Sequence, residues 1–371
     1  MKNMKIAFVG NSALTMMNFR LGLMKVLSSE YEVVMIAPKD CELTPLEGTD
    51  IRFISVEMDS KGTNPFKDIR LYRHLIAVYR RERFDFVFHY TIKPVIYGSM
   101  AAAVTNTRYV SVVTGLGYTF IKRNWLFHLS CLLHRTALRK AESVWFLNDD
   151  DCGMFVQLGL VSPKKVHVIP GEGVDTAYFS SQQPLPERFT FLFCGRMLRY
   201  KGVELFVRAA ELLKKEFPSA RWQLLGPLDA NNLAGIKPNE MELWARQGLV
   251  EYLGVAKDVR PYLEQCTCLV LPSYFREGVP RSLMEAAAMQ RPIIATNSVG
   301  CKDVVIEGEN GLLCEPNNLD SLTDTMRRML HMPQDCLAEM GKNGRELMLR
   351  KFDERLIIKE YKDLLNKYFA K

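Results

Sequence analysis

The chain alternates short apolar runs with amphipathic segments along most of its length. Short apolar runs predict strands, whereas apolar residues at every third or fourth position predict helices. In the first half, the pattern predicts strands at 5–10, 31–37, 84–89, 109–114, 143–147 and 166–169, and helices at 18–28, 65–81, 94–105 and 123–140. Strands that alternate with helices in this way predict a doubly wound, parallel α/β sheet.

The alternation breaks at 171–188 and then restarts. Residues 180–187 are polar and include two prolines, a composition typical of a linker. The pattern then predicts strands at 189–194, 221–225, 250–253, 269–272 and 293–296, and helices at 203–217, 241–246, 258–265, 280–289 and 354–370. We therefore expect two Rossmann-like domains, 1–175 and 186–352, that face each other across a cleft, with ligands at the carboxyl ends of the strands.

The composition is that of a soluble globular protein, with 48% hydrophobic and 25% charged residues. No stretch approaches the roughly 20 apolar residues needed to span a bilayer, and the first ten residues predict a strand and not a signal peptide. The nine cysteines are scattered, and Cys266 and Cys268 lack the spacing of a zinc site. We expect reduced thiols and a cytoplasmic protein.

The net charge of +7 is unevenly placed. Residues 1–171 hold 22 Lys and Arg against 15 Asp and Glu, whereas residues 172–371 hold 27 of each. An excess of cations in the first half predicts an anionic partner there, such as membrane lipid or a phosphorylated acceptor. Ordinary variation of surface charge is the alternative.

Two cations stand beside a glycine turn in the second half. A predicted strand ends at Gly195 and a predicted helix begins near Gly202, and the loop between them carries Arg196 and Lys201. The amino end of a helix favours anions. Arg196 can bind two phosphate oxygens at once, and Lys201 supplies a point charge. The alternative is a surface loop with two solvated cations.

A second strand, loop and helix carry two carboxylates eight positions apart. The motif consists of Glu277, Gly278, Val279, Pro280, Arg281, Ser282 and Glu285. Pro280 suits the first turn of the helix because proline lacks an N–H, and the N–H groups beside it can hold phosphate oxygens. The two glutamates can accept hydrogen bonds from hydroxyls, Glu285 from ribose and Glu277 from a sugar. The alternative is a helix with exposed glutamates.

These motifs, in this order, resemble glycosyltransferase family 4, whose members are retaining enzymes of GT-B fold. The resemblance implies that Gly195, Arg196 and Lys201 hold the diphosphate of a UDP-sugar, that residues 277–285 hold its sugar and ribose, and that the backbone near Val255 reads the base. It assigns catalytic roles to Glu277, Arg196 and Lys201. Gly10 and Asn11, after the first strand, would approach the donor. The resemblance implies no metal, and a last helix, 354–371, that packs back on the first domain.

The same resemblance places the acceptor on the first domain, at His89, Lys93, Thr114, Gly115, Gly117 and Tyr118. Many relatives have a histidine where this chain has Thr114, which leaves open whether Thr114 or His89 assists the reaction. These segments resemble the subgroup that builds bacterial glycans on polyprenyl diphosphate, including N-acetylgalactosaminyltransferases that extend lipid-linked diacetylbacillosamine. Residues 118–127, with Arg135, Arg139 and Lys140, mix aromatic and basic side chains and favour a membrane surface. A core-facing helix with a solvated basic side is the alternative.

The resemblance thus implies a retaining glycosyltransferase, which we expect on the inner face of the bacterial cytoplasmic membrane. It would move an N-acetylhexosamine, with N-acetylgalactosamine favoured, from a UDP-sugar to an undecaprenyl-diphosphate-linked saccharide, in surface glycan or protein N-glycan assembly, with no nucleic acid as partner. A nucleotide-sugar epimerase or hydrolase and a non-catalytic nucleotide-sugar-binding component remain alternatives. A NAD-dependent oxidoreductase is disfavoured, because the turn at 9–12 has one glycine and not G-x-G-x-x-G.

Overall fold

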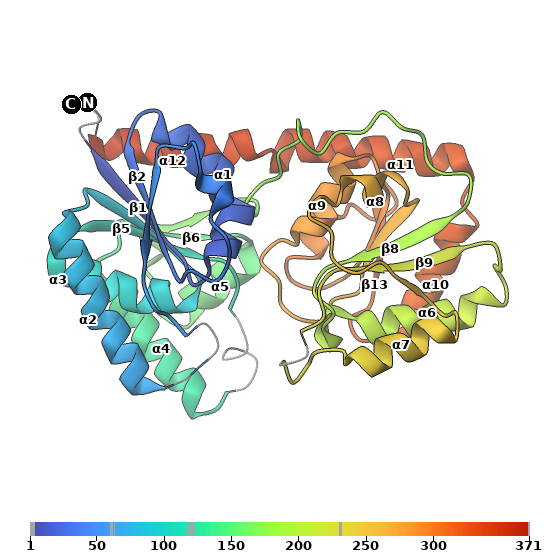
Figure 1. Cartoon of the computed structure of the whole chain (residues 1–371), viewed down its shortest axis with the longest axis horizontal. Coiled ribbons are helices and arrows are strands. Elements are labelled where there is room, and N and C mark those ends of the chain that lie inside the picture. Colours follow the sequence, from blue (N-terminus) through green and yellow to red (C-terminus); the bar gives the residue numbers. More distant parts are fainter. Residues whose placement is uncertain are drawn as a thin grey trace. The chain divides into compact units, whose positions relative to one another are not determined.

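The computed structural model describes residues 4–59, 62, 64–116, 120, 123–229 and 232–369. The chain forms two compact units, each built on its own parallel sheet (Figure 1). Unit 1 comprises Met1–Glu172 and Ile357–Lys371, and unit 2 comprises Gly173–Leu356. The division precedes the expected linker, so residues 180–187 belong to unit 2.

Unit 1 is built on a seven-stranded sheet in the order β3-β2-β1-β4-β5-β6-β7, with every adjacent pair of strands parallel. The strands are β1 (Lys5–Val9), β2 (Glu32–Ala37), β3 (Ile51–Ser55), β4 (Phe86–Tyr90), β5 (Arg108–Val113), β6 (Ser143–Phe146) and β7 (Val166–Val168). The helices are α1 (Ala13–Ser28), α2 (Pro65–Glu82), α3 (Ser99–Thr105), α4 (Trp125–Leu138) and α5 (Asp149–Gln157), with α12 (Glu354–Phe369) returning from unit 2.

The sheet of unit 1 is buried on both faces. Ala7 and Val9 belong to a core that includes Leu71 and Leu75 of α2. Phe8, between them in the sequence, stacks instead with Phe88 and contacts the ring of Tyr361 in α12. Successive residues of a strand point to opposite faces, so α2 and α12 cover opposite faces. Such double burial explains the continuous apolar runs in the sequence.

Unit 2 repeats this construction with six parallel strands in the order β10-β9-β8-β11-β12-β13. The strands are β8 (Thr190–Cys194), β9 (Arg221–Leu225), β10 (Glu251–Tyr252), β11 (Cys268–Leu271), β12 (Ile293–Thr296) and β13 (Gly311–Cys314). The helices are α6 (Val203–Lys214), α7 (Pro238–Arg246), α8 (Arg260–Glu264), α9 (Arg281–Ala288), α10 (Leu319–Leu330) and α11 (Gln334–Leu347). The predicted α/β class is therefore confirmed in both units.

Several elements differ from the sequence prediction. The prediction missed β3, α5, β13, α10 and α11. Helix α1 begins at Ala13 and not at residue 18, because the Ser12 side chain accepts a hydrogen bond from Thr15 N and caps the helix. The helix expected at 94–105 has two parts, a π-helix at Pro94–Gly98 followed by α3.

The expected linker is tied to unit 2 by a buried arginine. Arg291, 1% exposed, donates hydrogen bonds to the carbonyl oxygens of Gln183 (3.1 Å) and Pro184 (3.4 Å). The Gln290 side chain donates to Ser181 O at 2.8 Å. Residues 181–184 of the polar segment are therefore anchored to unit 2.

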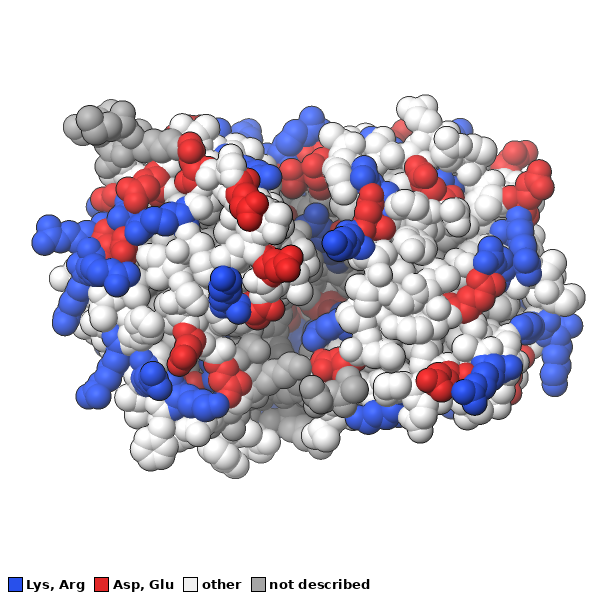
Figure 2. Space-filling view, in the orientation of Figure 1, with Lys and Arg blue, Asp and Glu red and all other residues white. Residues whose placement is uncertain are grey.

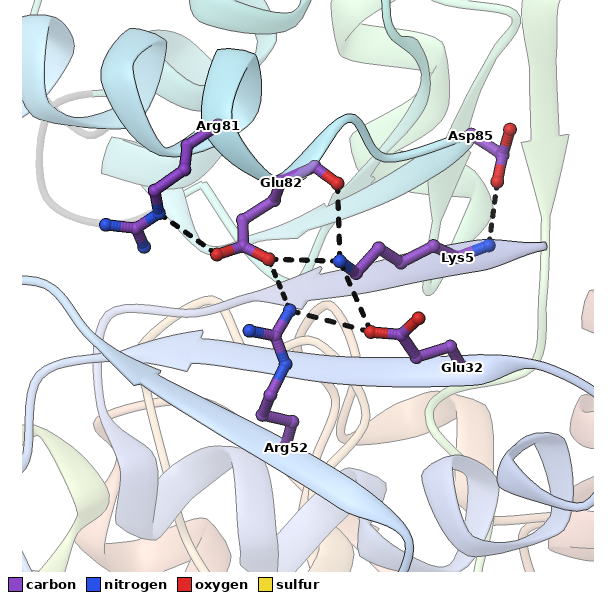
Figure 3. A network of polar contacts seen from close by, with 6 residues as sticks. All are labelled: Lys5, Glu32, Arg52, Arg81, Glu82 and Asp85. Carbon is purple, nitrogen blue, oxygen red and sulfur yellow. Dashed lines mark hydrogen bonds and ion pairs between the residues drawn. The ribbon is translucent and has the colours of Figure 1, made fainter. Parts of the chain in front are cut away.

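An ion network closes the amino end of the unit 1 sheet (Figure 3). The Glu82 carboxylate, 8% exposed, pairs with Lys5 at 3.0 Å, with Arg81 at 3.1 Å and with Arg52. Lys5 also pairs with Glu32 at 3.2 Å. Hydrogen bonds, chiefly from Arg52 and then from Lys5 and Arg81, lower the pKa of Glu82 to about 2 although burial opposes them.

The nine cysteines are all free thiols, as the sequence predicted. Cys266 and Cys268 are fully buried beside and within β11. Among the described residues, no helix is both long enough and apolar enough to cross a bilayer.

Candidate functional site

The first cation motif lies in the loop that follows β8 in unit 2. Two backbone hydrogen bonds join this loop to the segment after β9. Met197 N donates to Pro227 O at 2.9 Å, and Arg199 N donates to Ala234 O at 2.8 Å. Arg199 itself pairs with Glu204 and Glu240, so it is structural. Arg196 is exposed, and no salt bridge joins it to the described part of the chain. Its guanidinium is therefore available to an anion.

Gly202 fixes how the cation loop meets the second motif. Its φ of +82° is in the left-handed region, and a Cβ there would lie 2.2 Å from Pro272 O, at the end of β11. Only glycine accepts both the angle and the contact. The glycine thus brings the loop that carries Lys201 directly against the loop that follows β11.

Lys201 and Glu277 meet across these two loops. Lys201 Nζ lies 2.5 Å from Glu277 Oε1, and the side chains are 18% and 15% exposed. The same oxygen accepts a hydrogen bond from the fully buried Ser273 hydroxyl at 2.8 Å. The structure therefore joins a predicted phosphate ligand to a predicted sugar ligand. An entering diphosphate would share the ammonium of Lys201 with Glu277.

Helix α9 places the second carboxylate. Arg281 Nε donates to Glu285 Oε1 at 2.9 Å, one helical turn away. Burial raises the pKa of Glu285, although Arg281 opposes the rise. Burial also raises the pKa of the Cys194 thiol to about 12, and the charge of Glu285 contributes. Glu285 is therefore a largely buried carboxylate, 14% exposed, that is paired with Arg281.

One expectation for α9 is corrected. Pro280 occupies the N-cap, with φ −66° and ψ 121°, and not the first helical turn. Proline still suits this position, because the structure requires no donor there. Val279 is partly buried against the core. The loop before it packs closely on Gly300, because a Cβ on Gly300 would lie only 2.1 Å from the carbonyl oxygen of Gly278. Ser282 is partly exposed in the first turn of α9.

A glycine lies one or two residues after each of three neighbouring strands of unit 2. Gly195, Gly226 and Gly254 follow β8, β9 and β10, and Gly226 N donates to Gly254 O at 2.7 Å. A Cβ on Gly226 would lie 2.0 Å from Gly195 O. The backbone at these strand ends is thus closely packed, and Gly195 and Gly254 are partly exposed whereas Gly226 is buried. Val255, 69% exposed, follows directly.

In unit 1, the predicted donor residues Gly10 and Asn11 follow β1. Gly10 is buried and donates its N–H to Ile36 O at 3.0 Å, and Asn11 is partly exposed. Both lie at the carboxyl edge of the sheet, as predicted. They belong to a different unit from the remaining donor residues.

His89 and Lys93 both have partners within unit 1, and their expected role with the acceptor stays a prediction. His89 is fully buried, its Nε2 lies 2.9 Å from the Tyr79 hydroxyl and its Nδ1 lies 3.1 Å from Ser99 Oγ. Burial lowers its pKa to about 3, so it is neutral at physiological pH. Lys93 Nζ is paired with Asp68 at 2.7 Å and joins the π-helix to α2.

Thr114 and Gly115 remain partly exposed after β5, as an acceptor site requires. They line a small notch together with His134 of α4. The sequence prediction missed His134. A signal existed, because His134 lies seven positions after the apolar Phe127 and so shares its face of the helix. Gly117 and Tyr118 lie outside the described residues.

The expected membrane segment, 118–127, is divided between core and surface. Phe120 and Phe127 are 7% and 6% exposed and belong to the core, whereas Trp125 is 71% exposed. Tyr118, Thr119, Ile121 and Lys122 lie outside the described residues. The core-facing alternative therefore holds for two of the three described aromatic residues.

Across the described residues, no three His, Cys, Asp or Glu side chains come together as a metal site would require. Whether the reaction needs a metal stays a prediction.

Comparison with known families identifies the class. Residues 188–332 match the family described as "Glycosyl transferases group 1", and residues 5–148 match "Glycosyl transferase 4-like". The two matches fall on unit 2 and unit 1 respectively. The chain therefore belongs to the glycosyltransferases, as its motifs indicated.

Individual relatives agree with this assignment. The chain is 26% identical to the N,N'-diacetylbacillosaminyl-diphospho-undecaprenol alpha-1,3-N-acetylgalactosaminyltransferase of Campylobacter jejuni, over 98% of this chain and 99% of the relative. It is 25% identical to the UDP-Gal:alpha-D-GlcNAc-diphosphoundecaprenol alpha-1,3-galactosyltransferase of Escherichia coli, over 91% and 89%.

Solved structures show the same fold. Sucrose-phosphate synthase from Thermosynechococcus elongatus superposes with a TM-score of 0.81 at 19% identity, over 99% of this chain and 100% of that one. Anabaena HepE in complex with UDP-glucose superposes with a TM-score of 0.79 at 18% identity, over 98% and 100%. The fold is GT-B, as predicted.

Proposed function

We propose that the protein transfers an N-acetylhexosamine, with N-acetylgalactosamine favoured, from a UDP-sugar to an undecaprenyl-diphosphate-linked saccharide with retention of configuration. The observation that carries the proposal is the contact of Lys201 with Glu277 beside the exposed Arg196. The acceptor class is supported by the two relatives whose names contain diphospho-undecaprenol, and UDP by the name of the second.

In the proposed reaction, the bond from the anomeric carbon to the β-phosphate oxygen breaks. The acceptor oxygen bonds to the same face of that carbon, and its proton passes to the departing phosphate. Negative charge grows on UDP as it leaves, and Arg196 and Lys201 stabilise it. Charge-assisted contacts of this kind contribute about 3 to 4 kcal/mol each to lowering a barrier. Glu277, held by Lys201 and Ser273, would orient the donor sugar.

The first experiment offers the purified protein a panel of UDP-sugars and a short polyprenyl-diphosphate-linked saccharide. We expect a product heavier by one N-acetylhexosamine, with the anomeric configuration of the donor by NMR. Consumption of UDP-sugar without an acceptor would favour the epimerase or hydrolase instead. UDP binding without transfer to any lipid-linked saccharide would favour the non-catalytic alternative.

Variants test the residues. Arg196→Ala and Lys201→Ala should each lower kcat by about 100-fold or more while circular dichroism stays unchanged. Arg208→Ala, which removes an exposed cation of α6 outside the site, is the matched control and should keep full activity. Near-normal turnover in both site variants would refute the assignment. We also propose that no metal is required, so transfer should persist in EDTA.

We further propose that unit 1 binds the anionic inner face of the cytoplasmic membrane. Residues 64–140 hold 13 Lys and Arg against 3 Asp and Glu, so they carry the charge excess of the chain. Exposed Lys and Arg side chains line α2 (Figure 2, lower left). Trp125, Leu129 and Leu132 are 71%, 42% and 58% exposed at the spacing of one face of α4. Such a basic and apolar surface suits anionic lipid.

Vesicle sedimentation tests this surface. We expect binding to vesicles of phosphatidylglycerol and phosphatidylcholine but not to phosphatidylcholine alone, and about tenfold weaker binding after Trp125→Ser or Leu132→Ser. Leu243→Ser, on an equally exposed leucine of unit 2 (53%), should change nothing. Equal binding of all variants would place the contact elsewhere.

A further inference from the structure

The carboxyl ends of β4 and β5 in unit 1 enclose a notch that the proposed function does not yet use. Its lining includes Thr91, Thr114, Gly115, Phe120, His134 and Phe155. Thr91, Thr114 and Gly115 are partly exposed, whereas His134 and Phe155 are 2% and 0% exposed. The notch therefore runs from the surface down to the imidazole of His134.

The backbone at the mouth of the notch is strained. Thr91 has a φ of +66°, in the left-handed region, and it leads into the π-helix at Pro94–Gly98. A β-branched residue rarely adopts this angle, and a π-helix is a further departure from regular structure. Such strain collects at binding sites, where the surrounding structure holds it in place. Two irregularities at one strand end thus point to a function there.

The hydrogen bonds of His134 determine which of its ring nitrogens carries the proton. Nδ1 lies 2.8 Å from Ser130 O, and a carbonyl oxygen can only accept, so Nδ1 carries the proton. Nε2 then has a lone pair, and it makes no hydrogen bond to the described residues. Burial lowers the pKa of His134 to about 4, so the ring is neutral at physiological pH. His134 therefore offers a hydrogen-bond acceptor and not a cation.

The ring is held in place by aromatic neighbours. The Phe155 and Phe120 rings meet it edge-on, with centroids 5.3 Å and 5.7 Å away. The free volume, about 10 Å³ for the centre of a water-sized group, accommodates one water molecule or one hydroxyl. The notch thus combines a narrow opening with a hydrogen-bond acceptor, the His134 ring, that its aromatic neighbours hold in place.

We propose that this notch binds a single hydroxyl group of the acceptor saccharide, which donates its hydrogen bond to His134 Nε2. The inference rests on the proposed function for the identity of the saccharide. It adds a positioning residue, His134, that orients the acceptor without exchanging a proton. The ligand chemistry is that of a single sugar hydroxyl.

The test compares His134→Phe with the wild type. Phenylalanine keeps the ring between its aromatic neighbours but removes both nitrogens. We expect the KM for the lipid-linked saccharide to rise about five- to tenfold, the effect of one neutral hydrogen bond, while the Kd for UDP is unchanged. His128→Phe, on the exposed side of the same helix, is the matched control and should leave both constants unchanged.

A series of saccharides that each lack one hydroxyl locates the contact. For the saccharide that lacks the bound hydroxyl, wild type and His134→Phe should have equal KM values, and for every other member the difference should persist. If His134→Phe leaves the KM for the acceptor unchanged, or alters the Kd for UDP equally, the inference is overturned.

A direct measurement separates this inference from the proposed function. The imidazole ¹⁵N signal of Nε2 in His134, assigned by its loss in His134→Phe, should shift when lipid-free diphosphate-saccharide is added. A shift without transfer by the wild type would refute the proposed function and keep the site. Transfer without a shift would refute the site alone, and neither transfer nor shift would refute both.

Discussion

Glu82 should supply a measurable share of the stability of unit 1. Hydrogen bonds from Arg52, Lys5 and Arg81 lower its pKa from 4.5 to about 2. The interval corresponds to about 3 kcal/mol, and this is an upper limit because water reaches the edge of the sheet. We expect Glu82→Gln to destabilise unit 1 by about 2 to 3 kcal/mol at pH 7.

The lowered pKa also predicts how the contribution of Glu82 to the stability of unit 1 changes with pH. A carboxylate with a lowered pKa stabilises the folded state above the ordinary value, and the contribution is lost as the pH falls from 4.5 toward 2. The difference between wild type and Glu82→Gln should therefore be constant above pH 6 and decrease below pH 4.5.

Urea titrations monitored by hydrogen exchange of peptides from β1 and β4 would report unit 1 separately from unit 2. Glu47→Gln, on an exposed glutamate of the same unit, is the control and should change stability by less than about 0.5 kcal/mol. An equal stability of Glu82→Gln and wild type at pH 7, or a difference that grows in acid, would refute the reasoning.

Three further predictions concern unit 2. Gly202→Ala should cost about 2 kcal/mol or more and weaken UDP binding, because its Cβ would collide with Pro272 O. Gly248→Ala, with φ +66° but no backbone atom near its Cβ, should cost only about 1 kcal/mol in the same urea titration. Glu277→Gln should release Lys201, tighten UDP binding several-fold by calorimetry and lower kcat; weaker UDP binding would contradict the pairing. Arg291→Met should expose residues 181–184 to limited proteolysis, whereas an uncut chain would show that the arginine is not their anchor.

The sequence predicted the class of fold because both sheets are parallel and buried on two faces. A strand such as β11 is then a short, wholly apolar run that stands out between amphipathic helices. Strand β3 was missed for the opposite reason. It lies at the edge of the sheet, and its residues from Arg52 to Ser55 are exposed or half-buried, so the apolar run is broken.

Part of the candidate site was predicted from the sequence. Residues in short sequence motifs were found, whereas residues whose environment depends on distant segments were missed or were not seen to be buried. Lys201 and Glu277 lie in glycine-containing loops after apolar strands, and the structure brings them together. His89 also follows the pattern of a strand end, yet it is the fourth of five residues in a central strand and is covered by α2 and the π-helix. Its burial depends on packing between distant segments, which a local pattern does not contain.

The same dependence on distant segments hid Arg291 and His134. Arg291 follows a helix, and nothing near it in the sequence indicates that it anchors residues 181–184. His134 shares the apolar face of α4, where a histidine is ordinarily structural. Its significance appears only when β4 and β5 place Thr91 and Thr114 beside it.

In unit 1, the ion network that we expect to stabilise the fold and the notch that we propose as a binding site lie at opposite ends of the strands. The ion network joins Lys5, Glu32 and Arg52, at or near the first residues of β1, β2 and β3, whereas the notch with His134 lies at the last residues of β4 and β5. Parallel strands require this separation, because all their carboxyl ends meet at one edge. A change at Glu82 should therefore lower stability and leave the KM for the acceptor unaltered, and His134→Phe should do the reverse. If either variant altered both quantities equally, the two edges would be coupled through the strands.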